Sequence, residues 1–120
     1  MIKQFEDLEV WKLSRELVKR VYLLTAKDNI SKDYRFCNQI QSAIVSIMNN
    51  IAEGFERRSN KEFIQFLFIA KGSCGELRSL NYVALDINYI SQDEFNEINE
   101  SALLISKSLS GFIKYLKKSV

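Results

Sequence analysis

The fold is decided by the stretch Asn50-Ile51-Ala52-Glu53-Gly54, continued by Arg57-Arg58-Ser59 and Glu62-Phe63. This stretch lies where one long amphipathic segment ends and the next begins. We expect the first helix to end at Gly54, because glycine is favoured at helix C-termini. A serine followed three positions later by a glutamate, as in Ser59 and Glu62, forms a capping box that starts a new helix. The stretch therefore predicts a helix–turn–helix corner with two adjacent arginines at its tip.

On both sides of this corner, apolar residues recur at spacings of three and four, which is typical of amphipathic helices. Four helical segments are predicted: about Asp7 to Ala26, Lys32 to Phe55, Ser59 to Tyr89, and a last one that follows a second capping box of Ser91 and Glu94. The residues from Asp28 to Ser31 are predicted to be a loop. Short connections force successive helices to lie antiparallel. We therefore expect an all-α fold, an antiparallel up-down-up-down four-helix bundle.

Length and composition fit one domain over residues 1–120. Hydrophobic residues make up 47% of the chain and charged residues 27%, as in ordinary globular proteins. The chain has no proline and four glycines, so little interrupts long helices. No apolar run is long enough to span a bilayer, and the first residues lack the apolar core of a signal peptide. We expect no membrane contact and a cytoplasmic location.

Two segments carry more apolar surface than a single bundle can bury. No charged residue occurs from Phe36 to Ala52, although a surface helix needs a solvated face. The run from Phe63 to Ala70 is apolar nearly all the way round, and Ile64 and Phe68 are predicted to point away from the core. A monomer would expose them as a patch. We therefore expect a homo-oligomer built on the second and third helices, with Ile64 and Phe68 at its interface.

The residue types that catalysis needs are scarce. Without histidine, the chain lacks Ser–His and Cys–His pairs and the Glu-x-x-His ligands of di-iron bundles. Cys37 and Cys74 are expected to be small buried residues without a disulfide. Glu53 and Glu76 are a conceivable acid/base pair, but carboxylates on bundle helices are more often solvated or paired with arginine. We expect no enzyme activity, metal, cofactor or small-molecule substrate.

The second helix carries a polar stripe made of Gln39, Ser42, Ser46, Asn49, Asn50 and Glu53. Either these side chains form interhelical hydrogen bonds that fix the helix register, or they line a ligand-binding groove. We favour the hydrogen bonds, because buried polar groups must be satisfied. In that interpretation, Glu53 accepts hydrogen bonds from the backbone or from Ser73 at the corner.

Basic residues gather near the corner. Arg57, Arg58 and Lys61 lie at its tip, and Lys71 and Arg78 follow along the third helix. Phosphate contact needs clustered cations, and a ring of identical subunits would multiply each patch. The alternative is a solvated turn balanced by neighbouring glutamates. The net charge of +2 is too small to decide between the two.

The residues around the corner resemble a known family, the four-helix bundle proteins of 23S rRNA intervening sequences. The resemblance rests on Phe5, Leu8, Val10-Trp11, Gln39-Ile40, Ala43, Ser46-Ile47, Asn50-Ile51-Ala52-Glu53-Gly54, Arg58-Ser59, Glu62-Phe63, Phe66-Leu67, Ile69-Ala70, Gly72-Ser73 and Glu76-Leu77. It covers nearly the whole chain. The resemblance implies a structural role for the residues of its central motif: Asn50, Ile51, Ala52, Glu53, Gly54, Ser73 and Glu76.

This family is similar to the accessory proteins of diversity-generating retroelements, which are pentameric bundles thought to bind nucleic acid and reverse transcriptase through a basic surface. The resemblance thus implies a bacterial pentamer with RNA or a reverse-transcriptase-like protein as partner. The chain departs from the pattern at Gln41 and Ser42, where family members often carry two arginines, and at Met48, where a proline is common. The loss of two cations weakens the nucleic-acid interpretation.

Two functions follow from the sequence. The first is a non-enzymatic homo-oligomer that binds RNA or a ribonucleoprotein through the basic corner. The second is a protein-interaction scaffold without nucleic-acid binding. Clustered arginines favour the first function, and the uncharged helix faces favour the second.

Overall fold

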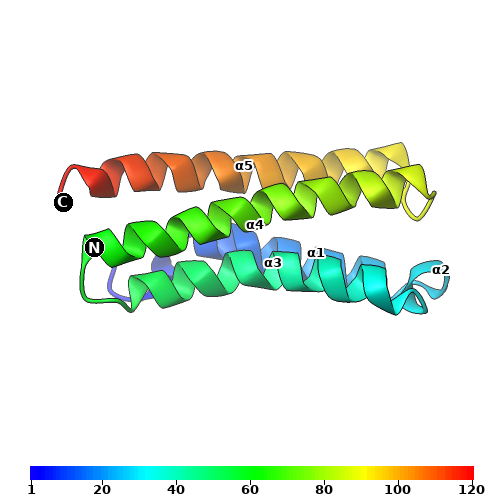
Figure 1. Ribbon diagram of the computed structural model, residues 1–120, viewed down its shortest axis with the longest axis horizontal. Coiled ribbons are helices and arrows are strands. Elements are labelled where there is room, and N and C mark those ends of the chain that lie inside the picture. The colour runs from blue at the N-terminus through cyan, green and yellow to red at the C-terminus, as the bar shows by residue number, and fades with distance from the viewer.

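The computed structural model describes residues 1–120 and contains helices only. The elements are a short 3₁₀ helix, η1 (Phe5–Asp7), and five α-helices: α1 (Glu9–Thr25), α2 (Asp28–Ser31), α3 (Tyr34–Phe55), α4 (Asn60–Asp86) and α5 (Gln92–Lys117). The predicted all-α class is confirmed. The four long helices lie along the longest axis of a molecule that measures 47 × 21 × 20 Å (Figure 1).

The molecule has two distinct ends (Figure 1). One, here called the corner end, holds the N-terminal segment, the α3–α4 connection and the last turns of α5. The other, the far end, holds α2 and the α4–α5 connection. Between the ends, α3 packs against α4, α4 against α5, and α1 against both α3 and α5.

The core runs the length of the molecule and receives apolar side chains from every α-helix. The largest fully buried ones are Leu17, Val21, Ile30, Ile40, Ile44, Ile47, Ile51, Leu67, Leu77, Ile98, Ile105 and Leu109. Burying one such side chain contributes roughly 1.5–3 kcal/mol. The apolar stripes predicted from spacing are these same residues in α3, α4 and α5, so periodicity located most of the core.

The segment from Asp28 to Ser31, predicted as a loop, is the one-turn helix α2, so that prediction was wrong. Its turn is closed by the Ser31 amide, which donates to the Lys27 carbonyl at 2.8 Å. Ile30 is fully buried. The inward anchor at Ile30 and the acidic Asp28 in the first turn both favour a helical turn.

Gly54 has a different role from the one predicted. The helix α3 does not end at Gly54 but at Phe55, the end that the predicted range of Lys32 to Phe55 gives, and no glycine in the chain has a positive φ. Gly54 is buried where α3 and α4 approach closely. A Cβ atom there would lie 2.7 Å from Cβ of Phe66 and 2.8 Å from Cδ1 of Phe63. Only glycine therefore permits this contact between the two helices without a shift of the backbone.

The starts of α4 and α5 follow the predicted caps. The Glu62 amide donates to Oγ of Ser59 at 3.2 Å, but the Glu62 carboxylate contacts that hydroxyl instead of the Ser59 amide, so this capping box is half formed. The box of Ser91 and Glu94 is complete. Both serines therefore mark helix starts, as expected.

The end of α4 comes at Asp86, three residues before the predicted end at Tyr89. Asn88 has a φ of 62°, in the left-handed region. The Tyr89 amide donates to the Ala84 carbonyl at 2.8 Å, and the Asn88 amide donates to the Leu85 carbonyl at 3.1 Å. This pair of bonds is a Schellman motif, with asparagine in the position that glycine usually takes.

Candidate nucleic-acid interface

The two arginines at the tip of the corner differ in their surroundings. Nη2 of Arg57 donates to Oε1 of Glu53 at 3.1 Å, and its guanidinium lies 4.7 Å from the centre of the Phe66 ring. Arg58 is exposed and has neither an ion-pair partner nor a side-chain hydrogen bond in the chain. The corner thus presents one guanidinium held in place and one that is free to bind an external anion.

Three lysines that the sequence analysis did not assign to this site lie at the same end: Lys114, Lys117 and Lys118. The C-terminal turns of α5 lie beside the α3–α4 connection (Figure 1). All three lysines are exposed and without ion pairs, and Nζ of Lys117 lies 5.4 Å from the centre of the Phe68 ring. The signal was present in the sequence, because the predicted arrangement of four antiparallel helices returns the chain end to the corner.

The five predicted nucleic-acid contacts divide into two groups. Arg57, Arg58 and Lys61 lie together at the corner. Lys71 and Arg78 lie along α4, roughly 15 Å and 26 Å from Lys61 at 1.5 Å per residue. Arg78 is half-buried, and its Nε donates to Oδ1 of Asn99 on α5 at 3.2 Å. Arg78 therefore joins two helices, and Lys71 is separated from the tip.

A cavity of about 580 Å³ opens at the corner end, beside the two arginines. Its inner wall is a row of edge-to-face aromatic rings: Phe55 and Phe63 lie 5.9 Å apart between ring centres, and Phe63 and Phe112 lie 5.2 Å apart. Tyr115 lines the cavity too and is 66% exposed. The cavity therefore joins an aromatic wall to a cationic rim.

The predicted interhelical hydrogen bonds are present in the middle of the polar stripe. The hydroxyls of Ser46 and Ser73 lie 2.8 Å apart, which joins α3 to α4. Nδ2 of Asn50 donates to the Ser46 carbonyl at 2.8 Å and to its hydroxyl at 3.0 Å. The expected bond from Ser73 to Glu53 was wrong, because Glu53 is exposed and accepts from Arg57.

Elsewhere the polar and motif residues are on the surface. Gln39, Ser42, Asn49 and Glu76 are exposed. Gln41, where the family often carries an arginine, is half-buried and donates from Nε2 to Oγ1 of Thr25 at 3.0 Å. This position ties α3 to α1.

The expectation that Ile64 points away from the core was wrong. Ile64 is 8% exposed and belongs to the apolar core, whereas Phe68, one turn later, is 48% exposed. The difference arises because α4 packs against both α3 and α5. Its buried arc is therefore wider than the stripe of a helix with one neighbour. Of the two predicted interface residues, only Phe68 presents an apolar surface.

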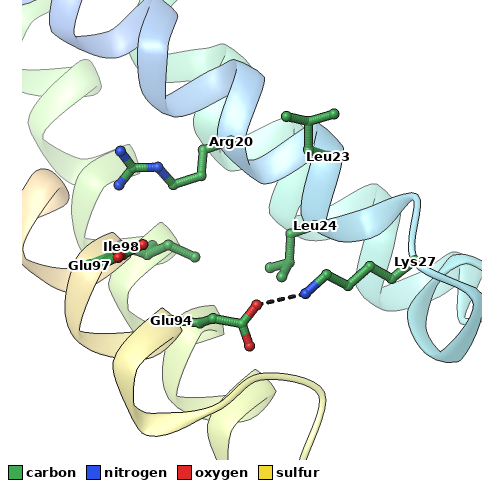
Figure 2. A pocket seen from close by; sticks show the side chains of 7 residues that line it. All are labelled: Arg20, Leu23, Leu24, Lys27, Glu94, Glu97 and Ile98. Atoms are coloured by element: carbon green, nitrogen blue, oxygen red, sulfur yellow. Dashed lines mark hydrogen bonds and ion pairs between the residues drawn. The ribbon is translucent and has the colours of Figure 1, made fainter.

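A second, smaller cavity of about 190 Å³ lies in the groove between α1 and α5 (Figure 2). Nζ of Lys27 and Oε2 of Glu94 form an ion pair across it at 2.6 Å (Figure 2). Nη1 of Arg20 donates to Oγ of Ser101 on α5 at 3.3 Å. The hydrogen bonds from Lys27 and then from the Ser91 amide lower the pKa of Glu94. These hydrogen bonds and the ion pair tie α5 to α1 and to the segment that follows it, whereas Glu97, which also lines the cavity, is exposed and has no partner in the chain.

The two cysteines are free, as expected, and both are buried. Burial raises the pKa of Cys74 to about 12, so its reactive thiolate form is scarce at neutral pH. No three carboxylate or thiol side chains converge as metal ligands would. None of the helices combines the length and the apolar character needed to cross a membrane.

Comparison with known proteins places this geometry in a family. The sequence model of the 23S rRNA-intervening sequence protein family matches residues 6–111. The fold is similar to the crystal structure of a protein with unknown function from the S23 ribosomal protein family of Bacteroides thetaiotaomicron VPI-5482. The two chains are 28% identical, with a TM-score of 0.81 over 88% of this chain and 98% of the other. No curated protein matches this chain.

Proposed function

Because the chain belongs to the family of 23S rRNA-intervening sequence proteins, we propose that it is a non-enzymatic homo-oligomer that binds RNA, free or within a ribonucleoprotein, through its corner end. One observation carries this proposal. Exposed cations without any ion-pair partner gather at that end: Arg58, Lys61, Lys114, Lys117 and Lys118. Such cations need no rearrangement of the fold to contact an external polyanion.

Phosphate is the anion that this arrangement fits. A cation that neutralises a phosphate releases condensed counterions, and this release drives much of the affinity for RNA. The gain is repeated when identical subunits present the same patch to one RNA molecule. A weak patch on each subunit therefore suffices in an oligomer, even with a net charge of only +2 per chain.

The proposed architecture is an antiparallel up-down-up-down four-helix bundle formed by α1, α3, α4 and α5, acting in a bacterial cytoplasm. Support comes from the short connections and from the contacts that link each long helix to two others. The bundle explains why residues from the beginning, middle and end of the chain meet at the corner end.

The RNA proposal is tested by the double substitution Arg57→Ala with Arg58→Ala, measured by fluorescence anisotropy with a structured rRNA fragment across a salt series. We expect weaker binding, and a slope of log affinity against log salt that is smaller by about 1.4 for two lost single-strand contacts. Circular dichroism checks that the variant is folded. Unchanged affinity and slope would remove these arginines from the site.

The proposed oligomer, a pentamer by analogy with the family, uses the outer face of α4. Phe68 and Ile69 are about half exposed there and lie side by side in sequence. Phe68→Glu is expected to lower the mass in solution, because a charge in an apolar interface is poorly solvated. Tyr34→Glu, at an exposed position on α3, is the matched control. An unchanged mass for Phe68→Glu would exclude Phe68 from the interface.

A protein-interaction scaffold is the second candidate, with a reverse-transcriptase-like protein as partner. It is favoured by Gly72 and Gly75 of α4, because a Cβ atom at either position would meet open space. A glycine inside a helix costs about 1 kcal/mol relative to alanine, and nothing within the chain uses these two. Small residues let a partner helix approach closely. Flat anisotropy with RNA at low salt would leave this scaffold as the function.

A further inference from the structure

The cavity at the corner end has a chemistry that phosphate contact alone does not require. Its volume of about 580 Å³ is typical of small-molecule sites, which span roughly 300–1,000 Å³. Three helices contribute its aromatic residues: Phe55 from α3, Phe63 from α4, and Phe112 and Tyr115 from α5. Phe63 belongs to the apolar core and Phe55 and Phe112 pack against it, so Tyr115 is the ring of this wall that the packing of the fold does not explain.

The charge of the cavity favours an anion. None of the residues that line it is acidic, whereas Arg57 and Arg58 are both among them. The first turn of α4 opens onto the same space through Ser59 and Asn60. The N-terminus of a long helix carries a partial positive charge and free backbone amides. An anionic group at the mouth of the cavity therefore meets the free guanidinium of Arg58, the guanidinium of Arg57, which also pairs with Glu53, and a helix start.

We propose that this cavity binds one unstacked nucleotide of an RNA, with the base against the aromatic wall and its phosphate at Arg57 and Arg58. The inference rests on the proposed RNA binding and names the form of RNA that the site takes. Bases in an A-form duplex are stacked on one another, so their faces are closed to aromatic side chains, and the major groove is too narrow for side chains to enter. Loops, bulges and ends present bases that can be stacked on aromatic rings. The site therefore selects unpaired RNA.

Tyr115 is the residue that separates this proposal from simple phosphate binding. Its ring is 66% exposed, and its hydroxyl has no hydrogen-bond partner in the chain. Phe63, by contrast, is buried and supports the fold. Tyr115 also lies outside residues 6–111, the part of the chain that the family model matches. Its replacement therefore removes a stacking surface without disturbing the core.

The test uses a single-stranded RNA that carries one 2-aminopurine, and the same strand paired with its complement. Binding is followed by anisotropy, and stacking by the fluorescence of the 2-aminopurine. Tyr115→Ala is expected to weaken single-strand binding about five- to a hundredfold, the range for loss of one base–aromatic stack. Tyr115→Phe is expected to retain affinity and stacking signal. Tyr34→Ala is the matched control, because Tyr34 is 73% exposed at the far end.

Three results are possible with wild-type protein and these variants. Tighter binding of the single strand than of the duplex, lost in Tyr115→Ala but not in Tyr34→Ala, supports the nucleotide site. Equal affinity of Tyr115→Ala and Tyr34→Ala, with weaker binding by Arg57→Ala plus Arg58→Ala, overturns the nucleotide site and leaves the proposed RNA binding intact. No binding by the wild type at low salt overturns both.

Discussion

The corner end and the far end differ in which charged side chains the fold ties down. At the far end, Asp33 accepts hydrogen bonds from the Phe36 amide at 3.1 Å and from the Tyr89 hydroxyl at 2.6 Å. Glu94 closes the capping box with Ser91 and pairs with Lys27. At the corner end, only Arg57 is paired, and the other cations face solvent. Three charged groups, Lys27, Asp33 and Glu94, therefore tie the far end together, whereas most cations at the corner end have no partner within the fold.

The balance of charge follows the same division. Residues 1–8, 53–62 and 110–120 hold seven bases and five acids, whereas residues 24–36 and 82–97 hold three bases and six acids. A small net charge therefore conceals a basic end and an acidic end. The comparison teaches that the local excess of bases over acids, and not the total charge, distinguishes the corner end as a surface suited to a polyanion.

The largest expected effect concerns the packing beneath the corner end. Gly54→Ala is expected to destabilise the protein by about 1–3 kcal/mol, as overpacking of a core does, because the new methyl group would overlap Phe66 and Phe63. Urea unfolding followed by circular dichroism measures the change.

The matched control for Gly54→Ala is Gly72→Ala, inside α4. A Cβ at Gly72 meets open space, so the control is expected to be stabilising by up to about 1 kcal/mol in the monomer. Equal effects of the two substitutions would show that helix propensity, and not close packing at the corner, governs Gly54.

A smaller effect compares the helix starts at the two ends. Ser91→Ala removes a complete capping box at the far end and is expected to cost about 0.5–2 kcal/mol. Ser59→Ala at the corner end removes a half-formed box and is expected to cost less, within the same range. Chemical unfolding of both variants gives the order. A larger loss of unfolding free energy for Ser59→Ala than for Ser91→Ala would show that the cap at the corner end is the stronger of the two, contrary to this prediction.

The smallest effect is the acid response of the far end. The pKa of Glu94 is lowered by Lys27 and Ser91, and the pKa of Asp33 by Tyr89 and Phe36. A carboxyl group whose pKa is lower in the folded protein stabilises the fold at any pH above its ordinary pKa, which is 4.5 for Glu94 and 3.8 for Asp33. This stabilisation is lost as the pH falls through the pKa of the group in the folded protein. The melting temperature should therefore begin to fall below about pH 4.5.

Glu94→Gln isolates one of these carboxyls. It is expected to lower the free energy of unfolding at pH 7 by no more than about 1 kcal/mol, because the ion pair is exposed. The melting temperature at pH 7 should therefore be lower than that of the wild type, and its decrease between pH 7 and acid should be smaller. Thermal unfolding at pH 7 and pH 3.5 makes the comparison. A variant with an acid response as steep as that of the wild type would show that Glu94 does not contribute to it.

The sequence predicted those features that depend on local pattern. Spacing located the long helices, and serine–glutamate pairs located two helix starts. Prediction from the sequence failed where contacts with other helices determine the structure. Four residues are too few for periodicity to indicate α2, and the two neighbours of α4 bury Ile64. The role of Gly54 comes from the approach of α4, which no local rule contains.

The candidate site was predicted only in part for the same reason. Arg57, Arg58 and Lys61 are adjacent in sequence, so their grouping was visible there. The lysines of α5 were not assigned to the site, because their place beside the corner depends on how the helices are arranged in space. The aromatic cavity joins Phe55, Phe63 and Tyr115 from three helices, and no spacing rule brings such residues together.

The central claim is that RNA binds the cations which folding leaves free at the corner end. The most direct test measures anisotropy with a structured rRNA fragment across a salt series for two double variants, Arg58→Ala with Lys61→Ala at the corner end and Lys32→Ala with Arg35→Ala at the far end. All four residues are exposed and without ion pairs. We predict that only the corner variant loses affinity, with a salt slope smaller by about 1.4. Equal losses for both variants, or none for either, would contradict the account.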